Sequence, residues 1–154
     1  MAMENKNDDM IIRRKSNIFI FNYVDNFSAE NSSIRDYEIG AENHLVGSNK
    51  KNIGKDNGKD KLGFILVNNN EGKKMVGFVG TIGNRVLDQQ PWRDNGGREW
   101  THIYKVKFHS NLIELDLLCE QLDIHKEIFT KSIHFGHVKS TYINQFNRVL
   151  NFFN

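Results

Sequence analysis

The chain has 154 residues, and its 21 Lys and Arg against 19 Asp and Glu leave a formal net charge of +2. This length suits one domain that buries its own core, and the balanced charge excludes a polybasic protein that binds nucleic acid through bulk electrostatics. The single cysteine, Cys119, excludes a disulfide framework and favours a reducing compartment, so we expect an intracellular protein, cytoplasmic or nuclear. No apolar run approaches the roughly 18 residues of a membrane span, and the first residues lack the apolar core of a signal peptide, so no membrane association is expected.

The N-terminal residues predict a polar lead followed by a buried strand. Residues 1–15 are largely polar, and we expect a flexible segment ahead of a single domain over 16–154. Residues 17–24 (NIFIFNYV) form an almost unbroken apolar run without Gly or Pro. Such a run predicts a strand that is buried on both faces.

A short helix and a polar loop are predicted next. Residues 28–39 suit a helix that Ser28 caps at its N-terminus and Gly40 stops at its C-terminus. Residues 47–61 contain three Gly, five Lys and two Asp, with almost nothing to bury. We expect this stretch to be a mobile, basic loop.

The middle of the chain predicts a β-hairpin. Its strands are 62–67 and 75–82, joined by a polar turn. The second strand and its end carry Gly77, Gly80 and Gly83 at a spacing of three residues. Glycines inside a strand indicate a bulge, a sharp bend or the close approach of another group.

The second half predicts a loop followed by two strands and two helices. Residues 85–100 form a polar loop that holds both tryptophans and the only proline, and 101–109 alternate as a half-exposed strand. Ser110 caps a helix whose leucine stripe consists of Leu112, Leu115, Leu118 and Leu122. Residues 131–138 suit a short strand, and 140–153 match an amphipathic helix packed on a core. The order predicts an α+β domain with a strongly curved mixed sheet or a small β-barrel flanked by helices.

No constellation of residues indicates an enzyme. Residues 73–80 (KKMVGFVG) superficially suit an acetyl-CoA-dependent transferase, which we keep as the least favoured class. Such a transferase holds the pyrophosphate on a glycine-rich turn between a strand and a helix, whereas these glycines lie inside a predicted strand. The acids at positions 114, 116, 120 and 123 fall on the outer face of a predicted helix. We therefore expect no catalytic residue and no cofactor.

A zinc site is the metal-binding alternative, and it is not favoured. The nearby ligand types are Cys119, His125, His134 and His137. Their spacing matches no common structural zinc site, and Cys119 lies beside the leucine stripe, where a small apolar side chain is ordinary. We expect a buried thiol and no metal.

An aromatic and basic grouping on the predicted loops is the feature that favours a binding function. Trp92 and Trp100 bracket a stretch that also carries Arg93 and Arg98. Two interpretations stay open: the indoles pin the loop to the domain, or they form a stacking platform for a base while Arg and Lys meet phosphates. The lysines of the 47–61 loop would then act as an electrostatic arm.

Seven segments carry a resemblance to a known family. In chain order they are 17–24, 44–49 (HLVGSN), 58–67 (GKDKLGFILV), 75–80 (MVGFVG), 99–107 (EWTHIYKVK), 111–121 and 135–140 (FGHVKS). Through them the chain resembles the EVE and YTH-like branch of the PUA superfamily over roughly 17–153. The resemblance implies a non-enzymatic domain that binds RNA or DNA and holds a modified, for example methylated, base in an aromatic pocket.

The resemblance and the stacking argument together give a set of candidate site residues. The candidates for pocket walls are Trp92, Trp100, Phe21 and Tyr104; those for polar contacts are Ser48 and Asn49; those for phosphate contacts are Lys50, Lys51, Arg98 and Lys139. The pocket segment of such families usually carries a Trp, where this chain has His44 and Leu45. That departure keeps an alternative open, a protein-interaction or host-interaction module on the same fold without a working base pocket.

Overall fold

The structure is a computed structural model, and it describes residues 18–23, 33–48, 61–97, 99–108, 111–129, 133–134 and 137–153. The predicted flexible segment over 1–15, the Ser28 cap, the Ser110 cap and most of the predicted 47–61 loop lie outside the described residues.

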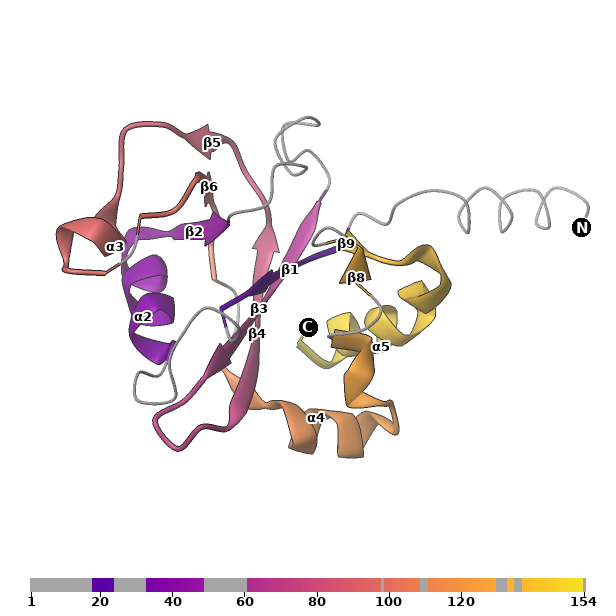
Figure 1. Ribbon diagram of the computed structural model, residues 1–154. Coiled ribbons are helices and arrows are strands. Elements are labelled where there is room, and N and C mark those ends of the chain that lie inside the picture. The colour runs from indigo at the N-terminus through magenta and orange to yellow at the C-terminus, as the bar shows by residue number, and fades with distance from the viewer. Residues whose placement is uncertain are drawn as a thin grey trace, which may run out of the picture.

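The strands are divided between two sheets (Figure 1). The larger sheet has the order β7-β4-β3-β1-β9-β8, with bounds Ile113–Glu114, Lys74–Thr81, Leu62–Asn68, Ile18–Asn22, His137–Val138 and Ile133–His134. The smaller sheet has the order β2-β6-β5, with bounds Leu45–Ser48, His102–Lys105 and Arg85–Val86. β1 and β3 are parallel and the other pairs are antiparallel, so the predicted mixed sheet within an α+β domain is confirmed. Neither sheet is closed or strongly curled, so the strong curvature or barrel closure that the sequence predicts is absent from the described part of the chain.

In the part of the chain that the structure describes, four α-helices cover the sheets on both sides. Their bounds are Ile34–Asn43 for α2, Pro91–Asp94 for α3, Leu115–Leu122 for α4 and Ile143–Phe153 for α5, with 3₁₀ turns η2 at Lys126–Phe129 and η3 at Ser140–Tyr142. α2 and α3 lie on the side of the smaller sheet, and α4 and α5 lie across the larger sheet from them (Figure 1). Among the described residues, no helix has the length and apolar character needed to cross a membrane.

β1 is buried on both faces, as the apolar run predicts. Phe19 and Phe21 join a hydrophobic cluster between the two sheets, which we call the inter-sheet cluster. Ile18 and Ile20 join a second cluster beneath α4 and α5. Alternate side chains of a strand point to opposite faces, so a strand at the centre of the molecule needs apolar residues at every position.

The predicted hairpin is confirmed, and of the three features that its glycines indicate, the structure shows a bulge. β3 and β4 pair antiparallel, with Gly63 opposite Gly80 and then Phe64 opposite Phe78, so Val79 is the extra residue. Gly80 has a φ of 83°, a left-handed conformation that glycine adopts at little cost.

The prediction that Gly40 ends the first helix is wrong. α2 continues to Asn43, and His44 ends it with a left-handed φ of 55°. Gly40 has a steric role instead, because a Cβ there would lie 2.6 Å from the carbonyl oxygen of Leu45 and 3.3 Å from Trp92. The glycine therefore lets the helix approach β2 and α3.

Other element boundaries also differ from the prediction. Gly47 and Ser48 belong to strand β2, and Lys61 is buried rather than part of a solvated loop. The predicted 85–100 loop contains β5 and α3, and the strand predicted over 101–109 is limited to β6. These elements are two to four residues long, which is too short for hydrophobic periodicity to reveal.

The last third of the chain follows the prediction more closely. α4 begins at Leu115 after the short strand β7, so Leu112 precedes the helix that it was predicted to join. The strand predicted over 131–138 is a pair of two-residue strands, β8 and β9. The C-terminal amphipathic helix is confirmed as α5, and its apolar face is buried at Phe146 and Val149.

Candidate functional site

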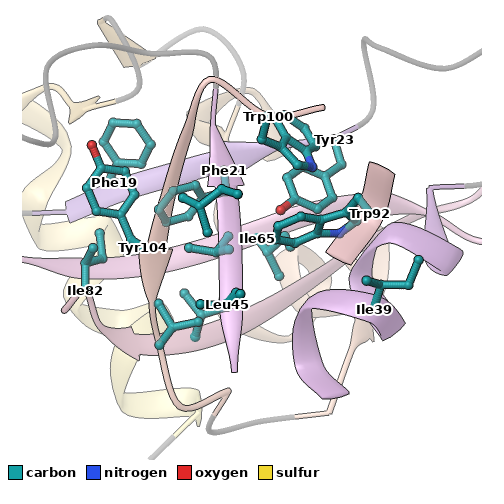
Figure 2. Close-up of a cluster of buried hydrophobic side chains, with 14 of the residues drawn as sticks. Phe19, Phe21, Tyr23, Ile39, Leu45, Ile65, Ile82, Trp92, Trp100 and Tyr104 are labelled. Atoms are coloured by element: carbon teal, nitrogen blue, oxygen red, sulfur yellow. The ribbon is translucent and has the colours of Figure 1, made fainter. Parts of the chain in front are cut away.

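Three aromatic rings from separate segments meet at one end of the inter-sheet cluster (Figure 2). Tyr23 stacks on Trp100 with ring centroids 4.8 Å apart and planes 24° apart. Trp92 meets Trp100 edge to face at 6.1 Å and 77°. We call Tyr23, Trp92 and Trp100 the aromatic triad. The structure therefore brings the two tryptophans together, and both side chains are buried.

Trp92 fastens α3 to α2. Pro91 opens α3 at a position where its fixed φ suits a helix start. The indole Nε1–H of Trp92 donates to the main-chain oxygen of Asp36 at 2.8 Å, and the N–H of Gly97 donates to the Trp92 carbonyl at 2.7 Å. Both ends of this residue are thus tied to neighbouring backbone, which supports the loop-pinning interpretation for Trp92.

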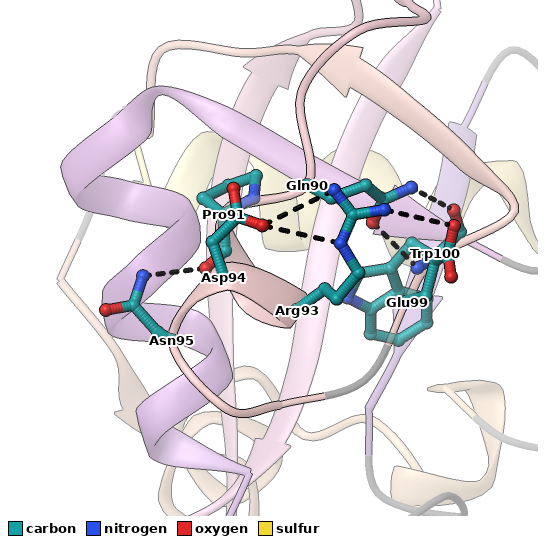
Figure 3. Close-up of polar contacts among 7 residues, drawn as sticks. All are labelled: Gln90, Pro91, Arg93, Asp94, Asn95, Glu99 and Trp100. Carbon is teal, nitrogen blue, oxygen red and sulfur yellow. Dashed lines mark hydrogen bonds and ion pairs between the residues drawn. The ribbon is translucent and has the colours of Figure 1, made fainter.

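Trp100 is held by a glutamine and lies against a glycine (Figure 3 shows the glutamine). Gln90 Nε2–H donates to the Trp100 carbonyl at 2.9 Å, and Trp100 N–H donates to Gln90 Oε1 at 3.2 Å. A Cβ on Gly47 would lie 2.3 Å from Cγ of Trp100, so only glycine leaves room for the indole.

Tyr23 is the residue of the triad that the sequence reasoning missed. Its hydroxyl accepts the N–H of Gly47 at 2.9 Å, and its own N–H donates to the Leu66 carbonyl at 2.9 Å. The signal for it was present: Phe19, Phe21 and Tyr23 alternate along one face of the first strand. Only the second of the three was chosen as a candidate.

The other candidates from the strands are buried but less close to the tryptophans. Phe21 belongs to the same cluster, whereas Tyr104 lies at the end of the cluster opposite the tryptophans (Figure 2). Ser48 is buried at the end of β2, where it pairs with His102 of β6. The structure thus brings Trp92 and Trp100 together and keeps Tyr104 apart from them.

Burial dominates the chemistry of Tyr104. Its side chain is 1% exposed, and its hydroxyl has no hydrogen-bond partner among the residues that the structure describes. Burial raises the pKa of this phenol, and the positive charge of Arg85 lowers it by a smaller amount. The hydroxyl is therefore neutral at physiological pH.

The charged candidates are mostly outside the described residues. Asn49, Lys50, Lys51 and Arg98 fall there. Lys139 is exposed and follows β9, which lies well away from α3 (Figure 1). The nearest described cation of the tryptophan loop, Arg93, pairs with Asp94 at 3.4 Å and Glu99 at 3.5 Å (Figure 3). These exposed carboxylates offset its charge.

Three features of the described residues bear on metal binding and on catalysis. No group of three or more His, Cys, Asp or Glu that could hold a metal ion occurs among them. Burial, and then the charge of Asp116, raise the pKa of the Cys119 thiol, which opposes formation of a nucleophilic thiolate. β5 follows the glycine-rich strand β4, so those glycines do not form a turn into a helix.

No protein-family model, curated protein or solved structure matches the chain.

Proposed function

We propose that the chain is a non-enzymatic nucleic-acid-binding domain of the PUA-like class, related in design to the EVE and YTH-like branch, and that it holds a base, methylated bases included, against the tryptophans of the aromatic triad. The observation that carries the proposal is the meeting of Tyr23, Trp92 and Trp100 at one end of the inter-sheet cluster. Stacking of a base on aromatic rings contributes about 1–3 kcal/mol per base, which offsets the cost of unstacking it from its strand.

The polar part of the proposal uses the ends of the same segments. Ser48 closes the strand that packs against Trp100, so Ser48 and the following Asn49 are proposed to contact the base edge. The proposed phosphate contacts come from nearby positions in the sequence and from Lys139. Two lysines, Lys50 and Lys51, follow Asn49, and Arg98 lies between the two tryptophans. A methyl group on the base adds apolar area and favours a dry aromatic site over a solvated groove.

The test is titration of intrinsic tryptophan fluorescence with RNA and DNA oligonucleotides, each in a plain and a methylated form, at low salt. Binding at the triad is expected to quench the emission, and the Trp92→Phe and Trp100→Phe variants assign the quenching to one indole. Absence of quenching and of any mobility shift with all four oligonucleotides would contradict the proposal.

A second candidate function is a protein-interaction module that keeps the fold without a working base pocket. The burial of Trp92 and Trp100, at 0% and 2% exposure, favours it, because indoles that complete a core offer no open face to a base. A nuclease-treated pull-down that recovers one stoichiometric protein partner, from a chain that binds none of the oligonucleotides, would support this second function instead.

A further inference from the structure

Tyr23 makes two contacts inside the fold that a nucleobase could reproduce. Its ring stacks on the indole of Trp100, and its hydroxyl oxygen accepts the main-chain N–H of Gly47 at 2.9 Å. A planar ring with a hydrogen-bond acceptor at its rim is also the general form of a nucleobase. The side chain is 1% exposed, so these contacts are fully formed in the folded chain.

The pairing of β2 explains why the N–H of Gly47 is available to a group outside the sheet. Val106 N–H donates to the His44 carbonyl at 3.0 Å, so this pair is of the hydrogen-bonded type. Antiparallel pairs alternate in type, and the register continues through Val46 with Tyr104. Gly47 therefore falls at a position whose N–H points away from β6, and the hydroxyl of Tyr23 meets it there.

Gly47 also sets how close the indole comes to this N–H. A Cβ at this residue would lie within 2.5 Å of three atoms of the Trp100 ring, so the strand passes in direct contact with the indole. A donor and a stacking surface are thus fixed side by side, the donor by the pairing of β2 with β6 and the indole by the hydrogen bonds between Trp100 and Gln90.

We propose that Tyr23 occupies, in the unliganded chain, the position of the ligand, and that it must leave this position before a nucleobase stacks on Trp100 and accepts the N–H of Gly47. The inference rests on the proposed function for the identity of the ligand. It adds the class of group recognised, which is a planar heteroaromatic ring with a hydrogen-bond acceptor at its rim. It also adds a means of controlling affinity, because Tyr23 blocks the site until it moves away. A site that is open in only a fraction of molecules binds with an apparent affinity reduced by that fraction.

The experiment compares four chains: the unmodified protein, Tyr23→Ala, Tyr23→Phe and Phe21→Ala. The probes are the free nucleosides adenosine, N6-methyladenosine, cytidine and 5-methylcytidine, followed by tryptophan fluorescence and thermal shift. Tyr23→Ala vacates the stack and is expected to bind at least one nucleoside at least tenfold more tightly than the unmodified chain. Tyr23→Phe keeps the ring on Trp100 and is expected to stay within about threefold of the unmodified chain.

Phe21→Ala is the matched control, because it removes an aromatic ring of similar size from the same cluster without exposing the donor of Gly47. It is expected to bind no better than the unmodified chain. A folded Tyr23→Ala chain that binds no nucleoside more tightly, or a Phe21→Ala chain that gains as much, overturns the inference.

A second measurement needs no variant and covers the case in which Tyr23→Ala fails to fold. In the unmodified chain, saturation with an oligonucleotide or nucleoside is expected to shift the amide resonance of Gly47 and the ring resonances of Tyr23. Binding that leaves both unchanged overturns the inference while the proposed function stands. If Tyr23→Ala binds nucleosides but no chain binds an oligonucleotide, nucleic-acid binding as the proposed function fails. The inference that Tyr23 occupies the position of a planar ligand then still holds. Absence of binding in every arm overturns both.

Discussion

Gly47 carries no side chain because the indole of Trp100 fills the space where one would be. The same reasoning applies to Gly40, which the Leu45 carbonyl and the ring of Trp92 approach closely. Neither glycine has a positive φ, so their role is to give room and not to provide conformational freedom. At the scale of single residues, the candidate site is thus defined as much by missing side chains as by the aromatic ones.

Gly47→Ala is expected to push Trp100 away from β2 and to lower the free energy of unfolding by about 1–3 kcal/mol, the range for overpacking a core. Urea unfolding measures the loss, and tryptophan emission is expected to change because the indole moves. Gly72→Ala is the control: it adds a methyl group that meets nothing within 4 Å, at a strained φ of 78°, so it costs stability without altering the emission. Unchanged emission and stability in Gly47→Ala would contradict the packing described.

Tyr104→Phe removes a buried hydroxyl that has no partner among the described residues, so we expect a change of stability within about 1 kcal/mol at pH 7, neutral or favourable. Burial raises the pKa of this phenol in the folded chain. The stability that the difference between the folded and unfolded pKa values contributes is therefore fully present below the unfolded pKa of about 10. It is lost as the pH rises above 10 toward the folded value, because the unfolded chain releases the proton first.

The variant is therefore expected to lose less stability than the unmodified chain between pH 8 and pH 10.5, as measured by urea unfolding at the two values. Tyr37 provides the control, because burial also raises its pKa. Since Tyr104→Phe leaves Tyr37 in place, the variant is still expected to lose some stability at alkaline pH. An equal loss in both chains would contradict the burial of the phenol.

At the scale of elements, the end of α2 shows how the position of a helix stop is set by packing. His44 takes the left-handed conformation that ends the helix, although glycine is the residue that suits it best. Gly40, four residues earlier, is retained inside the helix because β2 and α3 pack there.

His44→Gly is expected to raise the free energy of unfolding by about 0.5–1 kcal/mol, because it relieves a left-handed φ of 55° at an exposed position. The neighbouring change Asn43→Gly is the control, and it is expected to lower stability because that residue is still helical. Chemical denaturation of the three chains measures both. A loss of stability in both variants would show that His44 has a role beyond ending the helix.

The sequence predicted the long elements well for reasons that particular residues make clear. The strand over Ile18–Asn22, the hairpin of β3 and β4 and the C-terminal helix each bury a continuous apolar pattern that is visible without the fold. β2, β5 and α3 were missed because each is short, and their residues are ordered by partners distant in the chain. The main-chain oxygen of Asp36 accepts the hydrogen bond of the Trp92 indole, and the two residues are 56 positions apart in the chain. No local sequence pattern indicates a contact over that separation.

The candidate site was predicted in part. The proximity of Trp92 and Trp100 follows from their positions on one loop, whereas their burial depends on Gly47, Gln90 and Tyr23, which come from other segments. Tyr104 was selected as a pocket wall because it lies in an alternating strand, and that alternation does not say which end of the cluster it occupies.

At the scale of the whole molecule, the larger sheet separates two cores. Ile39 of α2 lies in the inter-sheet cluster and Leu118 of α4 lies in the second cluster. Residues without shared partners contribute independently to stability, so the two sides of the sheet can be varied separately.

Ile39→Ala and Leu118→Ala are each expected to cost about 2–5 kcal/mol, and the double variant is expected to lose the sum within about 0.5 kcal/mol. The control pair lies inside one cluster: Phe129 and Phe146 touch with centroids 5.0 Å apart, so Phe129→Leu with Phe146→Leu is expected to depart from additivity. Equilibrium unfolding of the single and double variants measures both pairs. Strong coupling across the sheet would mean that the two clusters are one.

The parallel pairing of β1 with β3 has a consequence for how the chain reaches its native state. Ile18 pairs with Leu62, which lies 44 positions further along the chain, whereas β3 and β4 are joined by residues 69–73 alone. A hairpin forms in microseconds, while a central strand contributed from far along the chain must wait for its loop to close. We expect substitutions at Ile65 or Val76 to slow refolding and those at Ile18 to act mainly on the unfolding rate. β1, which is buried on both faces in the native structure, would then be among the last strands to join the sheet during folding.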